Sequence, residues 1–170
     1  ALELKSSTGA IILAGGTDLM VRYRRWSGTL PVFNGDTLNI SNVDELTKIK
    51  LENDKLVIGA GCTLNQIITN ENTPPALIEA LLTNAAPGIR NAATLAGNIC
   101  NVSPAADSLP VLYILDAEIK LADIRGERII PVCDFITGPG KTLIKTDEIV
   151  TEIIIPVKKN QIAVFKKVGT

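Results

Sequence analysis

Alternating and continuous apolar runs predict strands along much of the chain. Ala117–Ala122 alternates between apolar and polar positions, and Arg128–Val132 follows after a turn, which predicts a β-hairpin. Lys55–Ile58 alternates in the same way and then meets two glycines, the pattern of a strand that ends in a turn. The full set of strand candidates is Ala10–Leu13, Pro31–Phe33, Thr37–Ile40, Lys55–Ile58, Ala117–Ala122, Arg128–Val132 and Ile149–Pro156.

Helical periodicity is clearest in Pro75–Asn84, where apolar residues recur at the spacing of one helix face and two prolines mark the start. Thr63 is a suitable N-cap for a second helix over Leu64–Thr69. Ala85–Pro110 contains many small and polar residues and few charges, which predicts an irregular segment of the kind that often carries function. Shorter helix candidates are Met20–Arg25, Val43–Ile49 and Ser108–Leu115.

Composition indicates a globular chain that lacks a charged surface for nucleic acid. The 170 residues suit about one compact domain or two small lobes, 46% are hydrophobic, and the net charge is −1. No apolar run approaches the ~18 residues of a membrane span, and no cleavable signal is visible. Both ends stop abruptly, so we expect a part of a longer protein.

The cysteine and histidine content restricts the kinds of catalysis and metal site that the chain can provide. Cys62, Cys100 and Cys133 are odd in number and irregular in spacing, which favours a reducing compartment, the cytoplasm, and predicts three buried apolar residues. Histidine is absent, which excludes Ser-His-Asp and Cys-His catalysis and histidine metal sites. We therefore predict no catalytic side chain and no metal site, and expect any chemistry to come from a cofactor.

The first candidate motif is LAGGTDL at Leu13–Leu19, between a predicted strand and a predicted helix. Adjacent glycines allow a turn that directs successive N–H groups at one anion, and they let the backbone approach a phosphate closely. The alternative is an ordinary strand-to-helix turn with Asp18 at the helix start. The motif lacks the G-x-G-x-x-G spacing of a Rossmann fold.

Two further motifs lie in the segment expected to be irregular. IRNAATLAGNI at Ile89–Ile99 offers a hydroxyl, a turn and an amide for a phosphate or ribityl group, or else it is an alanine-rich packed segment. SPAADSLP at Ser103–Pro110 brackets a helix start, for which simple capping is the alternative. GPGKT at Gly138–Thr142 is no P-loop, because Phe135 stands where the first glycine belongs and Pro139 lacks an N–H. We expect a loop between strands there.

The motifs LAGGTDL, IRNAATLAGNI and SPAADSLP, in this order, resemble the FAD-binding domain of molybdenum hydroxylases. This is the family of xanthine dehydrogenase, carbon monoxide dehydrogenase and nicotinate dehydrogenase. The resemblance covers nearly the whole chain. It implies an α+β fold of the vanillyl-alcohol-oxidase-like (PCMH-type) class, in which FAD lies between two α/β lobes. We expect these lobes at residues 1–52 and 53–170, with the C-terminal lobe of the family absent.

The resemblance also implies a set of cofactor contacts. The loop over residues 13–19 would hold the pyrophosphate through N–H groups, the next motif would complete the phosphate pocket, and residues beyond it would lie along the ribityl chain and ring. Ala96 stands where the family usually has a second glycine. The residues implied are Leu13, Ala14, Gly15, Gly16, Thr17, Asp18, Leu19, Thr94, Gly97, Asn98, Ser103, Asp107, Ile144 and Lys166.

The implied function is electron transfer through non-covalent FAD, since no histidine is present to carry a covalent flavin. In such assemblies molybdopterin and 2Fe-2S clusters are held by partner subunits, and FAD passes electrons to NAD or another acceptor. Two alternatives remain open. One is a stand-alone flavin oxidoreductase of the same fold, and the other is a scaffold subunit that has lost the flavin.

Overall fold

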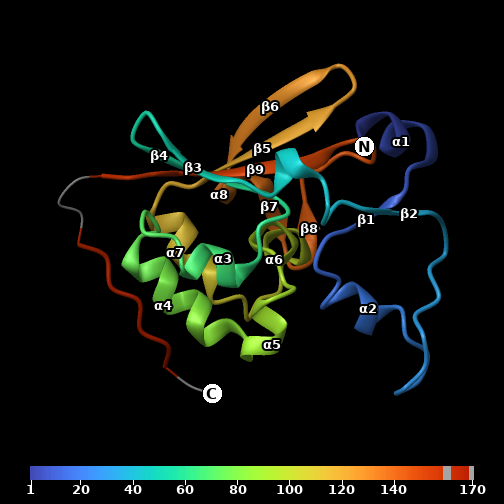
Figure 1. Cartoon of the computed structure of the whole chain (residues 1–170), viewed down its shortest axis with the longest axis horizontal. Helices are drawn as coiled ribbons and strands as arrows, with labels where there is room; N and C mark the ends of the chain where they lie inside the picture. The colour runs from blue at the N-terminus through green and yellow to red at the C-terminus, as the bar shows by residue number, and fades with distance from the viewer. Residues whose placement is uncertain (159–161, 169–170) are drawn as a thin grey trace.

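A five-stranded antiparallel sheet forms the centre of the molecule, in the order β3-β4-β9-β5-β6 (Figure 1). The computed structural model describes residues 1–158 and 162–168. The strands are β3 (Ile49–Glu52), β4 (Lys55–Gly59), β5 (Glu118–Asp123), β6 (Gly126–Pro131) and β9 (Ile149–Pro156). The strands predicted at β4, β5, β6 and β9 are confirmed, whereas β3 was not expected.

The two faces of this sheet differ in polarity. On one face Leu56, Ile119 and Ile153 are fully buried beneath the helices. On the other face Lys120 Nζ lies 2.7 Å from Glu127 Oε2 and 3.5 Å from Glu152 Oε2. Side chains of a strand alternate between faces, so alternating apolar and charged residues give one packed face and one hydrated face.

Helices cover the apolar face of the sheet (Figure 1). They are α3 (Leu64–Ile68), α4 (Pro75–Asn84), α5 (Pro87–Arg90), α6 (Leu95–Asn101) and α7 (Ser108–Ile114). The prediction that Ala85–Pro110 is irregular was wrong, because α5 and α6 lie within it. Leu95 and Ile99 are buried one helical turn apart, but glycine, alanine and asparagine around them dilute the apolar pattern.

A smaller unit at the N-terminus lies beside this sheet (Figure 1). It contains α1 (Leu2–Thr8), α2 (Leu19–Arg22) and the parallel pair β1 (Ile11–Leu13) and β2 (Thr37–Asn39), followed by a 3₁₀ turn at Asp44–Leu46. The predicted boundary between residues 52 and 53 falls in the turn of the β3–β4 hairpin, and both of these strands belong to the large sheet. The division into two lobes stays a prediction.

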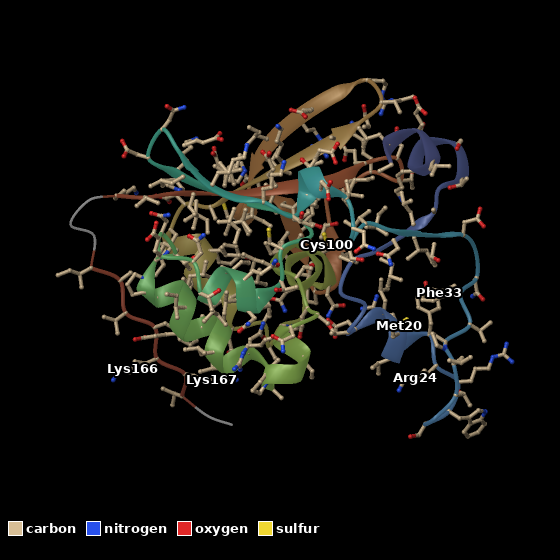
Figure 2. All side chains as sticks on the ribbon, in the orientation of Figure 1. Met20, Arg24, Phe33, Cys100, Lys166 and Lys167 are labelled. Atoms are coloured by element: carbon tan, nitrogen blue, oxygen red, sulfur yellow. The ribbon has the colours of Figure 1, made fainter. Side chains whose placement is uncertain are left out.

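The predicted strand at Pro31–Phe33 is not formed. This stretch belongs to the irregular segment between α2 and β2, where Figure 2 places Phe33. The Val32 N–H donates to the Tyr23 carbonyl at 3.0 Å, and the Tyr23 and Phe33 rings pack with centroids 4.8 Å apart. These contacts fold the segment back on α2, and an apolar run without a neighbouring strand cannot form a ladder.

The segment before β9 contains a short helix, α8 (Val132–Phe135), and a small hairpin of β7 (Ile136–Gly138) and β8 (Lys141–Thr142). Pro139 and Gly140 form its turn, which confirms a loop between strands at the glycine-proline sequence. Across the part of the chain that the structure describes, no helix has both the length and the apolar character needed to cross a bilayer.

We expect Thr63→Ala to lower the free energy of unfolding by about 1 kcal/mol, the usual cost of an N-cap. The Thr63 hydroxyl accepts the Gln66 N–H at 3.2 Å, and the Gln66 side chain accepts the Thr63 N–H at 2.8 Å. The variant therefore loses one half of a capping box. The measurement is the midpoint of urea unfolding. Thr69→Ala at the exposed end of the same helix is the control, and an equal loss there would contradict a special role for the cap.

Candidate functional site

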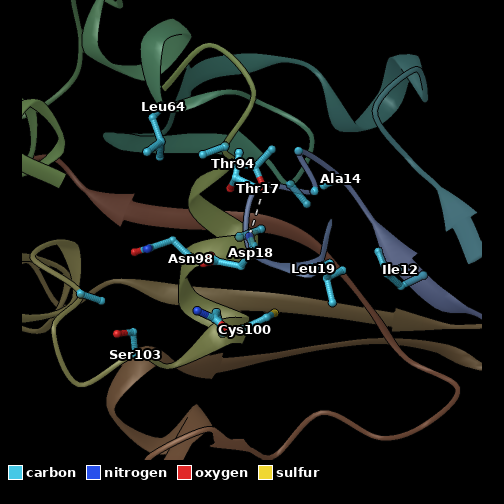
Figure 3. Close-up of a pocket in the computed structure, with 18 of the residues that line it drawn as sticks. Ile12, Ala14, Thr17, Asp18, Leu19, Leu64, Thr94, Asn98, Cys100 and Ser103 are labelled. Carbon is cyan, nitrogen blue, oxygen red and sulfur yellow. Dashed lines mark hydrogen bonds between the residues drawn. The ribbon is translucent and has the colours of Figure 1, made fainter. Parts of the chain in front are cut away.

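A cavity of about 540 Å³ opens between the N-terminal unit and the helices that cover the sheet (Figure 3). Its walls come from residues 11–22 on one side and residues 84–106 on the other. The remaining lining residues are Ile40, Ala60, Leu64, Ile144 and Val150. The volume lies in the range of small-molecule and cofactor sites, which are mostly apolar with a few placed polar groups.

The loop between β1 and α2 forms one end of this cavity. Ala14, Gly15, Gly16, Thr17, Asp18 and Leu19 all line it. Within residues 1–158 and 162–168, no acceptor is bonded to the N–H groups of Ala14 through Asp18, while Met20 N–H donates back to the Gly16 carbonyl at 2.8 Å. A glycine-rich turn with several free N–H groups is suited to an anion. The structure therefore supports the phosphate-binding interpretation of this loop.

Gly15 and Gly16 are required for two different reasons. Gly16 has φ +69°, in the left-handed region that L side chains rarely adopt. A Cβ on Gly15 would lie 1.9 Å from the Ala92 carbonyl oxygen and 2.6 Å from the Ala92 carbonyl carbon. Gly15 thus lets the loop pack directly on the backbone that precedes α6. Gly15 is therefore required by contact between the two walls of the cavity. The sequence did not indicate this contact.

The second motif surrounds the start of α6. Thr94 is buried, and its hydroxyl accepts the Gly97 N–H at 3.1 Å, so this threonine caps the helix (Figure 3). Asn98 Oδ1 accepts the Ser108 hydroxyl at 2.5 Å, which ties α6 to α7. Both side chains also line the cavity. The structural and binding interpretations of these residues are therefore compatible.

Ser103 and Ile144 reach the same cavity from other segments. Ser103 follows α6, and its hydroxyl accepts the Ala105 N–H at 3.3 Å. Ile144 follows β8 and packs against the core while it presents part of its surface to the cavity. Residues far apart in sequence thus meet around one volume.

Three predicted residues do not line the cavity. Leu13 belongs to β1, immediately before the loop. The Asp107 carboxylate accepts Lys167 Nζ at 2.8 Å and the Thr83 hydroxyl at 3.4 Å, which turns it towards α4 and the C-terminal tail. Lys166 is exposed in that tail, which runs outside α4 (Figure 2). The structure does not bring Asp107 and Lys166 to the cavity.

The motifs did not indicate several lining residues on and near α6, among them Cys100, Asn101 and Ala105. Leu95 and Ile99 face the core, so the opposite side of the helix faces the cavity, but this pattern is visible only if the segment is read as a helix. The expectation of three buried cysteines was wrong for two of them, because Cys62 is buried and Cys100 and Cys133 are exposed. Cys100 lies in the concave wall of the cavity, where desolvation by the surrounding protein raises its pKa to about 12.

Comparison with known proteins identifies close similarity over nearly the whole chain. The family model described as the FAD binding domain in molybdopterin dehydrogenase matches residues 1–158. The putative xanthine dehydrogenase FAD-binding subunit XdhB of Escherichia coli is 37% identical over 157 residues, which cover 90% of this chain and 52% of that protein. The nicotinate dehydrogenase FAD-subunit of Eubacterium barkeri is 36% identical over 154 residues, covering 85% and 49%.

Similarity extends to solved structures. Reconstituted CO dehydrogenase from Oligotropha carboxidovorans superposes with a TM-score of 0.82 at 28% identity, over 92% of this chain and 55% of that one. The chain thus spans about half the length of the relatives that it matches.

Proposed function

This chain belongs to the FAD binding domain family of molybdopterin dehydrogenases, and from that membership we propose that the cavity between its N-terminal unit and α6 holds FAD without a covalent bond. The α+β, PCMH-type fold predicted from the motifs is confirmed by the matching family and structures. The two α/β lobes of that fold would then form the two walls of the binding site.

One observation carries the proposal: a row of unpartnered N–H groups on a glycine-rich loop opens onto a cofactor-sized cavity. The loop at residues 14–18 would bind the diphosphate through these N–H groups. Gly97 and Asn98 would complete the polar side, while Ile144 and its apolar neighbours would pack against the ring. The donor set and the apolar lining both fit a dinucleotide with an aromatic head.

Bound FAD would supply the redox chemistry, while the chain's own residues bind, orient and shield it. No described side chain of this site is arranged as a catalytic acid–base pair. Thr94 and Asn98 hold α6 in place through their hydrogen bonds to Gly97 and Ser108, so they position the wall against which the cofactor would lie. Asp107 and Lys166 would not contact FAD, because neither side chain lines the cavity.

The wider role that we propose is electron transfer within a molybdopterin-dependent dehydrogenase. Relatives are named as FAD-binding subunits of xanthine and nicotinate dehydrogenases, which supports partner subunits that carry molybdopterin and 2Fe-2S clusters. NAD or another oxidant would accept the electrons. Co-purification of molybdenum and iron with the protein would separate this role from that of a stand-alone flavin oxidoreductase.

The test is flavin binding by the purified full-length protein. We expect visible flavin absorption that moves to the supernatant after heat denaturation and is identified there as FAD. Stripped protein should take up FAD in a 1:1 ratio, and FMN should bind far more weakly because it lacks the diphosphate bridge and the adenosine. A colourless protein that takes up neither flavin would contradict the proposal and favour the scaffold alternative.

A further inference from the structure

The proposed site would place a doubly charged diphosphate in a cavity that holds few compensating charges. Among the described residues that line it, Arg22 is the one cation and Asp18 is the one carboxylate. The loop N–H groups carry only partial positive charge. A full positive charge would offset the repulsion between a diphosphate and the Asp18 carboxylate, and among the described lining residues Arg22 is the side chain that can supply it.

Arg22 is placed on the cavity by the same turn that forms the loop. α2 begins at Leu19, and the Arg22 N–H donates to the Asp18 carbonyl at 2.9 Å. Residues four apart on a helix share one face, so Asp18 and Arg22 both face the cavity. The loop and Arg22 thus line the same cavity.

The guanidinium is held by the opposite wall. Arg22 Nη2 donates to Asn101 Oδ1, at the end of α6, although the two residues are 79 positions apart in the sequence. Arginine has five N–H donors, and this is the one hydrogen bond that the Arg22 side chain makes within residues 1–158 and 162–168. Most of the planar donor set is left for an anion, and the bond to Asn101 fixes the group beside the cavity.

We propose that Arg22 is the charged clamp for the cofactor's diphosphate, with Asn101 as the residue that positions it. This inference rests on the proposed FAD function. A guanidinium matches phosphate oxygens with two parallel hydrogen bonds, which an ammonium group cannot do. Arg22 contributes binding and orientation and takes no part in electron transfer.

The experiment measures the FAD dissociation constant of the stripped full-length protein by flavin fluorescence at low and high sodium chloride concentration. We expect Arg22→Gln to weaken binding about 10- to 100-fold at low salt, the range for a hydrogen bond to a charged group. The loss should shrink at high salt, because screening weakens the interaction in the unmodified protein. Arg22→Lys should give an intermediate loss, and Asn101→Ala a smaller one that keeps the salt dependence.

Arg24→Gln is the matched control, since Arg24 carries the same charge two residues further on and does not line the cavity (Figure 2). It should change the affinity less than twofold. If Arg22→Gln behaves like this control, or if its loss is the same at every salt concentration, the clamp is wrong although FAD binding stands. If the unsubstituted protein binds no FAD, the proposed function fails and this inference fails with it.

Discussion

Gly15→Ala is expected to abolish tight FAD binding and to lower the free energy of unfolding by about 3 kcal/mol, the upper part of the range for overpacking. The new Cβ would lie 1.9 Å from the Ala92 carbonyl oxygen, which belongs to backbone and cannot rotate away. The loop and the segment before α6 must then separate. Because these segments are the two walls of the cavity, the N–H groups of the loop move relative to Gly97 and Asn98. N–H groups that have moved in this way can no longer bind the diphosphate together with Gly97 and Asn98, so tight binding is lost.

Gly88→Ala is the matched control for this variant. A Cβ on Gly88, in α5, would meet no atom within 4 Å, and its backbone conformation is one that alanine adopts readily. We expect FAD affinity to be unchanged and stability to rise by about 0.4–1 kcal/mol, because alanine restricts the unfolded chain. Urea unfolding and flavin titration of both variants provide the measurement. Gly15→Ala with the affinity and stability of the parent protein would contradict the close packing described for this loop.

Arg128→Ala is expected to lower the free energy of unfolding by about 3 kcal/mol, the low end of the range for a broken buried ion pair. Glu148 is only 2% exposed, and Arg128 donates to both of its carboxylate oxygens, at 2.7 and 2.8 Å. Without Arg128, the carboxylate keeps the Lys145 N–H at 2.8 Å, while Lys145 Nζ lies 3.9 Å away. We expect the smaller loss of stability within this range because Arg128 is itself a third exposed, so water can reach part of the vacated space.

The effect of Arg128→Ala should depend on pH. The hydrogen bonds from Arg128 lower the pKa of Glu148 below its usual value of 4.5, against the opposing effect of burial, and the Lys145 N–H adds to the shift. A lowered pKa in the folded state gives stability that is present above the unfolded pKa and is lost as the pH falls through the folded pKa. The difference between the parent protein and the variant should therefore be large at pH 7 and shrink below about pH 4.5.

The measurement is urea unfolding of both proteins between pH 7 and pH 3. Arg125→Ala on the same hairpin is the control, because Arg125 is well exposed and pairs with Asp123 and Asp147 at the surface. Exposed pairs contribute little, so its unfolding midpoint at pH 7 should stay close to that of the parent. A constant difference between Arg128→Ala and the parent at every pH would show that lost packing, and not the ion pair, causes the destabilisation.

Strong apolar patterns explain which elements could be predicted. α4 and β9 have the predicted bounds, because apolar residues recur on one face of α4 and dominate β9, and prolines mark the start of α4 and the end of β9. α6 was missed because its two large core residues, Leu95 and Ile99, are separated by small and polar ones. The Thr94 cap and packing on the sheet make this segment a helix. β3 was missed because its residues are mostly exposed and its pairing with β4 is what forms the strand.

The site could be predicted as far as local backbone chemistry determines it. The loop at residues 14–19 and the Thr94 cap of α6 could be recognised because their conformations follow from their own residues. Both line the cavity. Side-chain direction depends on tertiary neighbours that the sequence does not reveal: Asp107 pairs with Lys167 and does not line the cavity, and its contact with the cofactor stays a prediction. Arg22 has no motif around it, and only the three-dimensional position of α6 shows that it faces Asn101.

The cavity joins parts of the chain that lie 79 positions apart at the Arg22–Asn101 bond, so the protein acquires its site only when these parts meet. No fragment that lacks either wall can form the cavity, so the site exists only after long-range closure of the chain. The thermodynamic cost of so long a closure grows slowly with length, but contacts distant in sequence form late during folding. A ligand held by both walls would therefore bind the completed fold alone, and would raise its stability in proportion to the logarithm of the ligand concentration.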